Sequence, residues 1–273
     1  MQKSINSFDK IKINYDICNI KNKKDFLVFI HGVGGDLTAW KKIRDRFHKL
    51  GISTLAIDLR GHGKSEKPKL LEDYKIKKFA QDIKEILKKE KITHPILIGH
   101  SFGGMVTLTF HRLYPKLPKE YVLIGGTYKA PIKLTTTMKK FSSLILFLNK
   151  RFITIFPKRK KRYGKRGKFL GEVVTNNTIR LFFDIMNTSF KSWLFTLENI
   201  NKFDEENILK TITKPVLILS GGKDDIISVK NSEKLHKMIK SSILKIFPEG
   251  NHILILTNPK EVSEEIYTFI NKF

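Results

Sequence analysis

The sequence has little of what secreted and membrane-spanning proteins depend on. Its 273 residues include one cysteine, Cys18, so no disulfide can form within the chain. Residues 1–15 contain no apolar stretch of signal-peptide length, and no apolar run reaches the roughly 18 residues that a membrane-spanning helix needs. We therefore expect a soluble, cytoplasmic protein in which Cys18 is a buried strand residue in a reducing compartment.

Patterns that hold metals or nucleotides are also missing. No His/Cys cluster has the spacing of metal ligands, and no glycine-rich phosphate-binding loop is present. We expect neither a metal nor an organic cofactor. Acidic residues are few as well: 26 Asp and Glu face 52 Lys and Arg, which gives a formal net charge of +26.

The pentapeptide GHSFG at residues 99–103 is the most informative motif that the chain does contain. It follows a short apolar run at 95–98 that predicts a buried strand, and it precedes residues 104–114, whose apolar pattern predicts a helix packed on a sheet. A strand that turns sharply into a helix at a serine is a nucleophile elbow. The flanking glycines are needed because side chains would collide in so tight a turn. This context predicts Ser101 as a nucleophile.

A serine hydroxyl is a poor nucleophile at neutral pH, so it needs a general base, usually a histidine, which a carboxylate orients. Downstream, Asp224 follows a strand predicted at 216–220, and His252 follows a strand predicted at 243–247. The carboxyl ends of strands are where open α/β sheets place their sites. Asp225 is the alternative to Asp224, and either carboxylate could instead cap the helix that starts near residue 229.

Five motifs, in this order, resemble the α/β-hydrolase fold superfamily, and in particular its single-domain esterases, lipases and C–C hydrolases. They are HGVGG at 31–35, DLRGHGKS at 58–65, the elbow at 99–103, GGKD at 221–224 and GNH at 250–252. The resemblance implies a catalytic triad of Ser101, Asp224 and His252. It also implies an oxyanion hole made by two backbone N–H groups: Phe102 at the start of the elbow helix, and Val33 after the strand at 26–30.

Strands and helices alternate along most of the chain. Strands are predicted at 11–17, 26–30, 54–59, 96–99, 121–125, 216–220 and 243–247, and helices at 37–50, 74–89, 104–114, 232–239 and 259–271. This alternation predicts a mainly parallel, twisted sheet with helices on both faces. We expect one core domain of residues 1–126 and 214–273, with residues 127–213 inserted as a helical cap or lid.

The insertion has an unusual charge pattern. Residues 121–171 contain fourteen Lys and Arg and no Asp or Glu, and within them the apolar stretch 141–156 precedes the basic run 158–168. Three interpretations remain open: a solvated loop shaped by compositional bias, a surface at 141–168 that rests on anionic lipid, or a nucleic-acid footprint. We disfavour nucleic acid because the chain has no recognition motif or stacking platform.

These observations predict a serine hydrolase that cleaves a carboxylic ester with an apolar acyl or alcohol part, in the manner of a carboxylesterase or monoacylglycerol lipase. The expected partner is a small-molecule ester. The same machinery also serves the hydrolysis of C–C bonds, lactones, thioesters and amides, the last as in iminopeptidases. Some proteins of this fold only bind a ligand, because the fold does not dictate the function.

Overall fold

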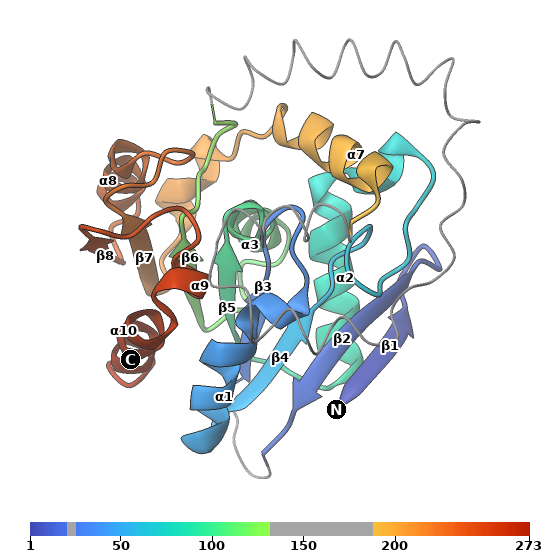
Figure 1. Ribbon diagram of the computed structural model, residues 1–273, viewed down its shortest axis with the longest axis horizontal. Helices are drawn as coiled ribbons and strands as arrows, with labels where there is room; N and C mark the ends of the chain where they lie inside the picture. Colours follow the sequence, from blue (N-terminus) through green and yellow to red (C-terminus); the bar gives the residue numbers. More distant parts are fainter. Residues whose placement is uncertain (21–25, 132–187) are drawn as a thin grey trace.

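The protein is built around one eight-stranded sheet, which the computed structural model describes within residues 1–20, 26–131 and 188–273 (Figure 1). The strands lie in the order β1-β2-β4-β3-β5-β6-β7-β8. Their bounds are β1 Gln2–Asn6, β2 Lys12–Cys18, β3 Phe26–Ile30, β4 Ser53–Ile57, β5 Pro95–His100, β6 Glu120–Ile124, β7 Val216–Gly221 and β8 Ser242–Phe247. Strand β2 is antiparallel to both neighbours, whereas β3 to β8 are all parallel to one another, which confirms the mainly parallel sheet.

The central strands are mostly apolar and buried throughout because both of their faces are covered. In β3, Val28 and Ile30 join one core cluster, whereas Leu27 and Phe29 join a second cluster. Successive side chains of a strand point to opposite faces, so the two clusters are the two sides of the sheet. A parallel strand buried in this way reads as an unbroken hydrophobic run in the sequence.

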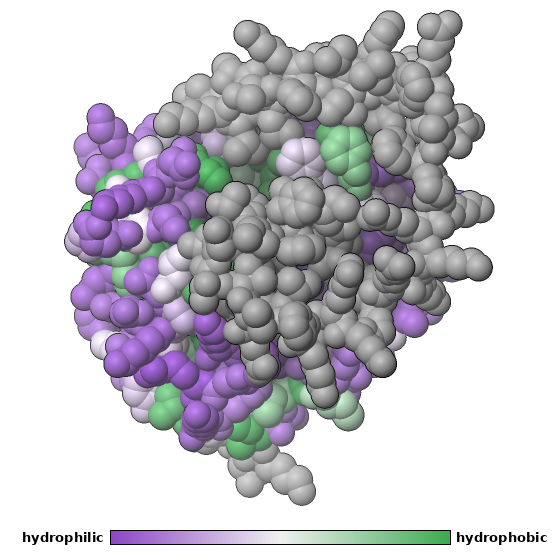
Figure 2. All heavy atoms as spheres, viewed as in Figure 1, coloured by the Kyte–Doolittle hydropathy of each residue, from purple (hydrophilic) through white to green (hydrophobic). Residues whose placement is uncertain are grey.

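Helices cover both faces, as the sequence predicts. On one face lie η1 Leu37–Trp40, α1 Lys41–Lys49, α9 Leu254–Thr257 and α10 Pro259–Ile270, and on the other α2 Ile76–Lys89, α3 Phe102–Leu113, α7 Phe190–Ile200 and α8 Val229–Met238. Two further 3₁₀ segments are η2 Leu71–Tyr74 and η3 Glu206–Thr211. The flank formed by α8, β8 and α10 is mostly hydrophilic in Figure 2, as expected for the solvent side of such helices. Among the described residues, no helix is long and apolar enough to cross a membrane.

Several elements differ from the sequence prediction. Strand β1 was not predicted because its sequence, QKSIN, is mostly polar, and it lies at the exposed edge of the sheet, paired only with β2. Helix α7 lies within residues 127–213, where the sequence predicts a helical insertion but gives no bounds for any helix. Cys18 is only partly buried, because it is the last residue of β2, so the expectation of a buried cysteine is wrong. The apolar and basic stretch 141–168 lies outside the described residues.

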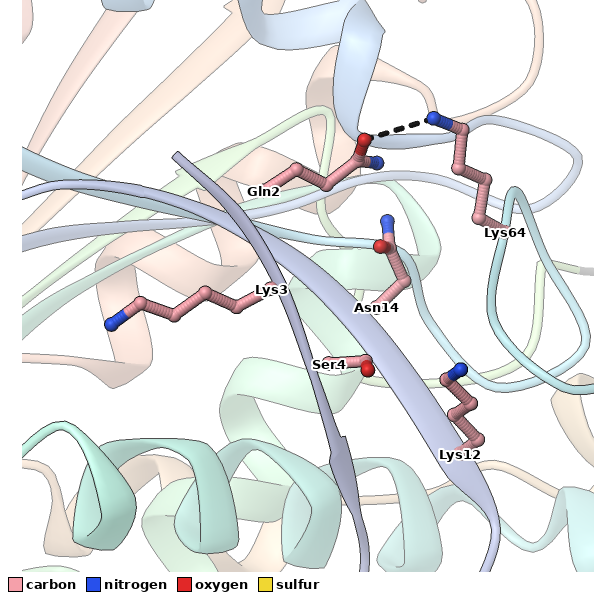
Figure 3. Close-up of a pocket in the computed structure, with 6 residues that line it drawn as sticks. All are labelled: Gln2, Lys3, Ser4, Lys12, Asn14 and Lys64. Carbon is pink, nitrogen blue, oxygen red and sulfur yellow. Dashed lines mark hydrogen bonds between the residues drawn. The ribbon is translucent and has the colours of Figure 1, made fainter. Parts of the chain in front are cut away.

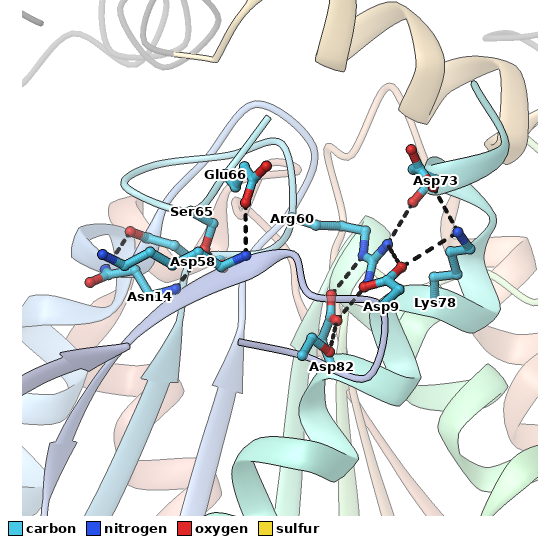
Figure 4. A network of polar contacts seen from close by, with 11 residues as sticks. Asp9, Asn14, Asp58, Arg60, Ser65, Glu66, Asp73, Lys78 and Asp82 are labelled. Carbon is cyan, nitrogen blue, oxygen red and sulfur yellow. Dashed lines mark hydrogen bonds and ion pairs between the residues drawn. The ribbon is translucent and has the colours of Figure 1, made fainter. Parts of the chain in front are cut away.

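A buried ion-pair network holds the loop that follows β4 (Figure 4). The guanidinium of Arg60, which is fully buried, donates from Nε and Nη2 to the carboxylate of Asp82 on α2, at 2.7 and 2.6 Å. Asp9, in the turn between β1 and β2, accepts from Nη1 at 3.0 Å and also pairs with Lys78. Breaking such a buried pair by removing one partner costs about 3–5 kcal/mol, because a charge is left uncompensated. The network therefore ties three separate segments to the end of the sheet that carries the loops described next.

Candidate active site

The turn between β5 and α3 has the strand–turn–helix geometry that the sequence predicts for a nucleophile elbow. The strand ends at His100 and the helix begins at Phe102, so Ser101 is the only residue between them. Its φ of 51° and ψ of −114° lie where a residue with a side chain is strained. The turn is held by the Ser101 N–H, which donates to the carbonyl of Ile124 at 2.9 Å. The strain exposes the serine side chain at the tip of the turn.

Two glycines allow this turn to close. A Cβ added to Gly99 would lie 2.3 Å from the carbonyl oxygen of Gly103, and one added to Gly103 would lie 2.1 Å from the carbonyl oxygen of Ile30. Both contacts are with backbone atoms, which cannot swing aside as the end of a side chain can. Any larger residue at either position would therefore push α3 away from β5 or from β3.

Ser101, His252 and Asp224 form one chain of hydrogen bonds. The Nε2 atom of His252 lies 2.9 Å from Oγ of Ser101, and its Nδ1 atom lies 2.8 Å from Oδ2 of Asp224. A carboxylate only accepts, so Nδ1 carries the ring proton and the Nε2 lone pair faces the serine hydroxyl. His252 is 9 % exposed, whereas the Asp224 side chain is fully buried. The ring is thus held in the tautomer that a general base requires.

The backbone that follows β7 orients Asp224. Its Oδ1 atom accepts from the N–H groups of Ile226 and Ile227, at 2.9 and 2.7 Å, which leaves Oδ2 for the histidine. The neighbouring Asp225 is exposed to solvent. Helix α8 has Ser228 at its N-cap, so neither aspartate takes the capping position that was the alternative interpretation. Of the two acids, only Asp224 is brought to His252.

A second histidine, His100, supports the backbone of the first. Its Nε2 atom lies 2.9 Å from the carbonyl oxygen of His252, and the two ring centroids are 5.3 Å apart. Burial, together with the nearby His252, lowers the pKa of His100 to about 3, so the ring stays neutral and donates to that carbonyl. Sequence reasoning assigned His100 no role. Its place beside Ser101 in the pentapeptide was the available signal.

The HGVGG segment after β3 forms a tight turn against the serine. A Cβ on Gly32 would lie 3.3 Å from the Ser101 Cβ atom, so the turn passes directly beside Ser101. The Gly35 N–H donates to the Gly32 carbonyl at 3.2 Å, and Gly34 has a φ of 81°, as the third position of a type II turn requires. Within the described chain, no backbone carbonyl accepts from the N–H of Val33 or of Phe102.

His31 sets the direction of the Val33 N–H. The Leu59 N–H donates to Nε2 of His31 at 3.1 Å, so the ring proton is on Nδ1, which donates to the Gly32 carbonyl at 2.7 Å. Burial lowers the pKa of His31, which keeps the ring neutral and this pattern intact. The Gly32 carbonyl and the Val33 N–H belong to one planar peptide and point in opposite directions. Holding that carbonyl therefore aims the Val33 N–H.

Two surface hollows of the described chain lie elsewhere. One, of about 340 Å³, is at the β1–β2 edge and is lined by Gln2, Lys3, Ser4, Lys12, Asn14 and Lys64 (Figure 3). Two of its lysines are already engaged, Lys3 with Glu90 and Lys64 with Gln2. The other, of about 440 Å³, lies between the start of α2 and the segment 199–208. Neither hollow is lined by Ser101, Asp224 or His252.

Comparison with known proteins agrees with this fold. Residues 25–259 match the family described as alpha/beta hydrolase fold. Protein ABHD8 of Bos taurus is 26% identical over 246 residues, which are 89% of this chain but only 55% of that protein, so the chain spans about half the length of this curated relative. The proline iminopeptidase of Saccharolobus solfataricus is 27% identical over 285 residues, covering 96% of this chain and 90% of that protein. An esterase structure from Exiguobacterium antarcticum shares the fold, with a TM-score of 0.77 at 20% identity, covering 99% of this chain and all (100%) of that one.

Proposed function

This chain belongs to the alpha/beta hydrolase family, and on that premise we propose that it is a serine hydrolase that cleaves a carboxylic ester with an apolar acyl or alcohol part. The observation that carries the proposal is the unbroken hydrogen-bond chain from Ser101 through His252 to Asp224. A hydroxyl, an imidazole and a buried carboxylate in this order are the parts that nucleophilic acyl transfer needs.

The first half of the proposed reaction forms an acyl-enzyme. Oγ of Ser101 attacks the ester carbonyl carbon while Nε2 of His252 takes the hydroxyl proton. Asp224 accepts from Nδ1 throughout and stabilises the imidazolium that forms. The negative charge on the former carbonyl oxygen is held by the N–H groups of Val33 and Phe102, the second of which lies at the positive end of α3. When the tetrahedral intermediate collapses, His252 gives its proton to the leaving alcohol.

The second half releases the acid. Nε2 of His252 takes a proton from water, whose oxygen attacks the acyl carbon, and the same two N–H groups hold the second oxyanion. The carbon–Oγ bond then breaks and the proton returns to Ser101. Each step uses the one ring atom that faces the serine, so the fixed tautomer of His252 is what makes the cycle possible.

The proposed preference for an apolar ester is supported by partly exposed apolar side chains on the face of the sheet that carries α3. Val33, Trp193 and Phe195 are partly exposed apolar side chains that pack against the same core cluster as Phe102. The relatives named above include a proline iminopeptidase, so hydrolysis of an amide is the alternative to be tested alongside esters. We also propose residues 1–126 and 214–273 as the catalytic core and residues 127–213 as a cap over it.

Labelling with a fluorophosphonate tests the proposal directly. The wild-type protein should be labelled at Ser101, and it should hydrolyse p-nitrophenyl butyrate faster than a prolyl amide or a simple lactone. Ser101→Ala should abolish both labelling and hydrolysis. A protein that is folded but neither labelled nor active on any of these substrates would indicate a ligand-binding role instead.

A further inference from the structure

The hydroxyl of Thr188 reaches the turn that carries Val33, from a segment far away in the sequence. Its Oγ1 atom donates to the carbonyl oxygen of Gly34 at 3.0 Å, across a separation of 154 residues. Thr188 is 2 % exposed, so water does not readily substitute for this contact. Thr188 belongs to none of the five sequence motifs, and it is not one of the residues assigned above to the triad or to the oxyanion hole.

Two planar peptides connect this contact to the Val33 N–H. The Gly34 carbonyl that accepts from Thr188 shares its peptide plane with the Gly35 N–H. That N–H donates to the Gly32 carbonyl, which in turn shares its plane with the Val33 N–H. A donor on the Gly34 oxygen thus fixes the first plane, and the hydrogen bond to Gly32 passes the constraint to the second.

Glycine makes the turn dependent on such outside support. Gly34 adopts a φ of 81°, and Gly32, Gly34 and Gly35 make up the turn with Val33, so three of its four residues have no side chain to restrict them. His31 restrains the Gly32 carbonyl from one side. Thr188 restrains the far end of the turn.

Hydrogen bonds hold the start of α7, next to Thr188, in place. The next residue, Ser189, caps α7 by accepting from the Ser192 N–H at 3.1 Å. The Ser192 hydroxyl lies 2.7 Å from that of Tyr74, which donates to the Pro68 carbonyl at 3.0 Å. Ser192 and Tyr74 are both buried. The start of α7 is therefore fastened to Tyr74, the last residue of η2, and Thr188 lies two residues before the first residue of this anchored helix.

We propose that Thr188 is a positioning residue for the oxyanion hole: its hydroxyl holds the 32–35 turn so that the Val33 N–H points at the developing oxyanion. This inference rests on the proposed hydrolase function and extends it to a residue outside the motifs. The effect acts on the transition state, because the oxyanion exists only there and in the tetrahedral intermediate.

Replacing the hydroxyl by a methyl group of similar size tests the idea. Thr188→Val should lower kcat on p-nitrophenyl butyrate about 10- to 100-fold with little change in KM, less than the roughly 10²–10³-fold of losing an oxyanion donor outright. The inhibition constant of a trifluoromethyl ketone, whose adduct carries the same oxyanion, should rise by a similar factor. Thr188→Ser keeps the hydroxyl and should remain within about threefold of wild type.

Thr196→Val is the matched control. Thr196 is a fully buried threonine of α7 whose hydroxyl donates to the Ser192 carbonyl at 2.8 Å, so replacing it leaves in place the Ser192 hydroxyl and N–H that anchor the start of the helix. Its replacement should leave kcat per active site unchanged. Active sites are counted by exhaustive fluorophosphonate labelling, so that turnover is compared per folded molecule.

The possible outcomes distinguish a failure of the positioning role of Thr188 from a failure of the proposed hydrolase function. If Thr188→Val folds poorly, Thr188→Ser and Thr188→Ala form the deciding pair, and the serine variant should be the faster by about tenfold or more. Equal turnover per labelled site in the valine or alanine variant and in wild type would overturn the positioning role. A wild-type protein that the fluorophosphonate does not label would instead refute the proposed hydrolase function itself.

Discussion

Replacing Asp224 by asparagine changes one atom and is expected to disable the proposed base. In the native site, Oδ1 of Asp224 accepts from the Ile226 and Ile227 N–H groups, and Oδ2 accepts from His252. An asparagine would keep its carbonyl oxygen on the two N–H groups, because an NH₂ group there would face two donors. Its NH₂ group would then point at Nδ1 of His252 and donate to it.

The consequence is a reversed tautomer. With Nδ1 accepting, the ring proton moves to Nε2, the atom that lies 2.9 Å from the Ser101 hydroxyl. A protonated Nε2 cannot take the serine proton, and the imidazolium would also lose its anion. A change of this kind in a serine triad costs about 10⁴-fold in kcat, or roughly 5.5 kcal/mol of transition-state stabilisation.

The measurement is kcat and kcat/KM on p-nitrophenyl butyrate, together with a thermal unfolding curve for each variant. Asp225→Asn is the control, since that side chain is exposed and one residue away. It should stay within about threefold of wild type, as expected for a surface change. Equal losses in the two variants, or a larger loss for Asp225→Asn, would show that the reasoning about the acid is wrong.

Three further predictions address the nucleophile, the elbow and the undescribed segment. Ser101→Ala and His252→Ala should each lower turnover by about 10⁴-fold or more while leaving the unfolding midpoint near that of wild type, so near-normal ester hydrolysis by either would contradict the mechanism. Gly103→Ala would place a methyl group 2.1 Å from the Ile30 carbonyl oxygen, and it should destabilise the fold by at least about 1–3 kcal/mol, seen as a lower unfolding midpoint. If residues 141–168 rest on anionic lipid, the protein should sediment with anionic vesicles at low salt and be released as salt rises, because the attraction is screened over about 10 Å at 0.1 M. Replacing the five basic residues 158–162 by glutamine should weaken that binding without affecting hydrolysis of a soluble ester, and no sedimentation at low salt would favour the solvated-loop interpretation.

The sequence predicts a structural feature well where the interactions that determine it lie within one short segment. The unbroken apolar runs of the central strands indicate burial on both faces, and β3 to β8 follow them closely. The elbow is largely local too, because Gly99 meets the backbone of Gly103 within the same strand–turn–helix unit. Strand β1 was not predicted, because an exposed edge strand needs no apolar pattern. It needs only a partner strand with which to form hydrogen bonds, and that partner is β2.

Contacts between segments that are far apart in the sequence can be identified only from the folded structure. The GGKD motif favours Asp224 over Asp225 only by resemblance to a family, whereas the structure shows which of the two carboxylates meets His252, 28 residues away. The link from His100 to the His252 carbonyl and that from Thr188 to Gly34 span 152 and 154 residues. Such hydrogen bonds leave no periodicity or spacing in the sequence, because they depend on where two independent loops come to rest. The residue types and their order along the chain therefore identify the chemistry, whereas the packing of the loops at one end of the sheet selects the residues that hold it in place.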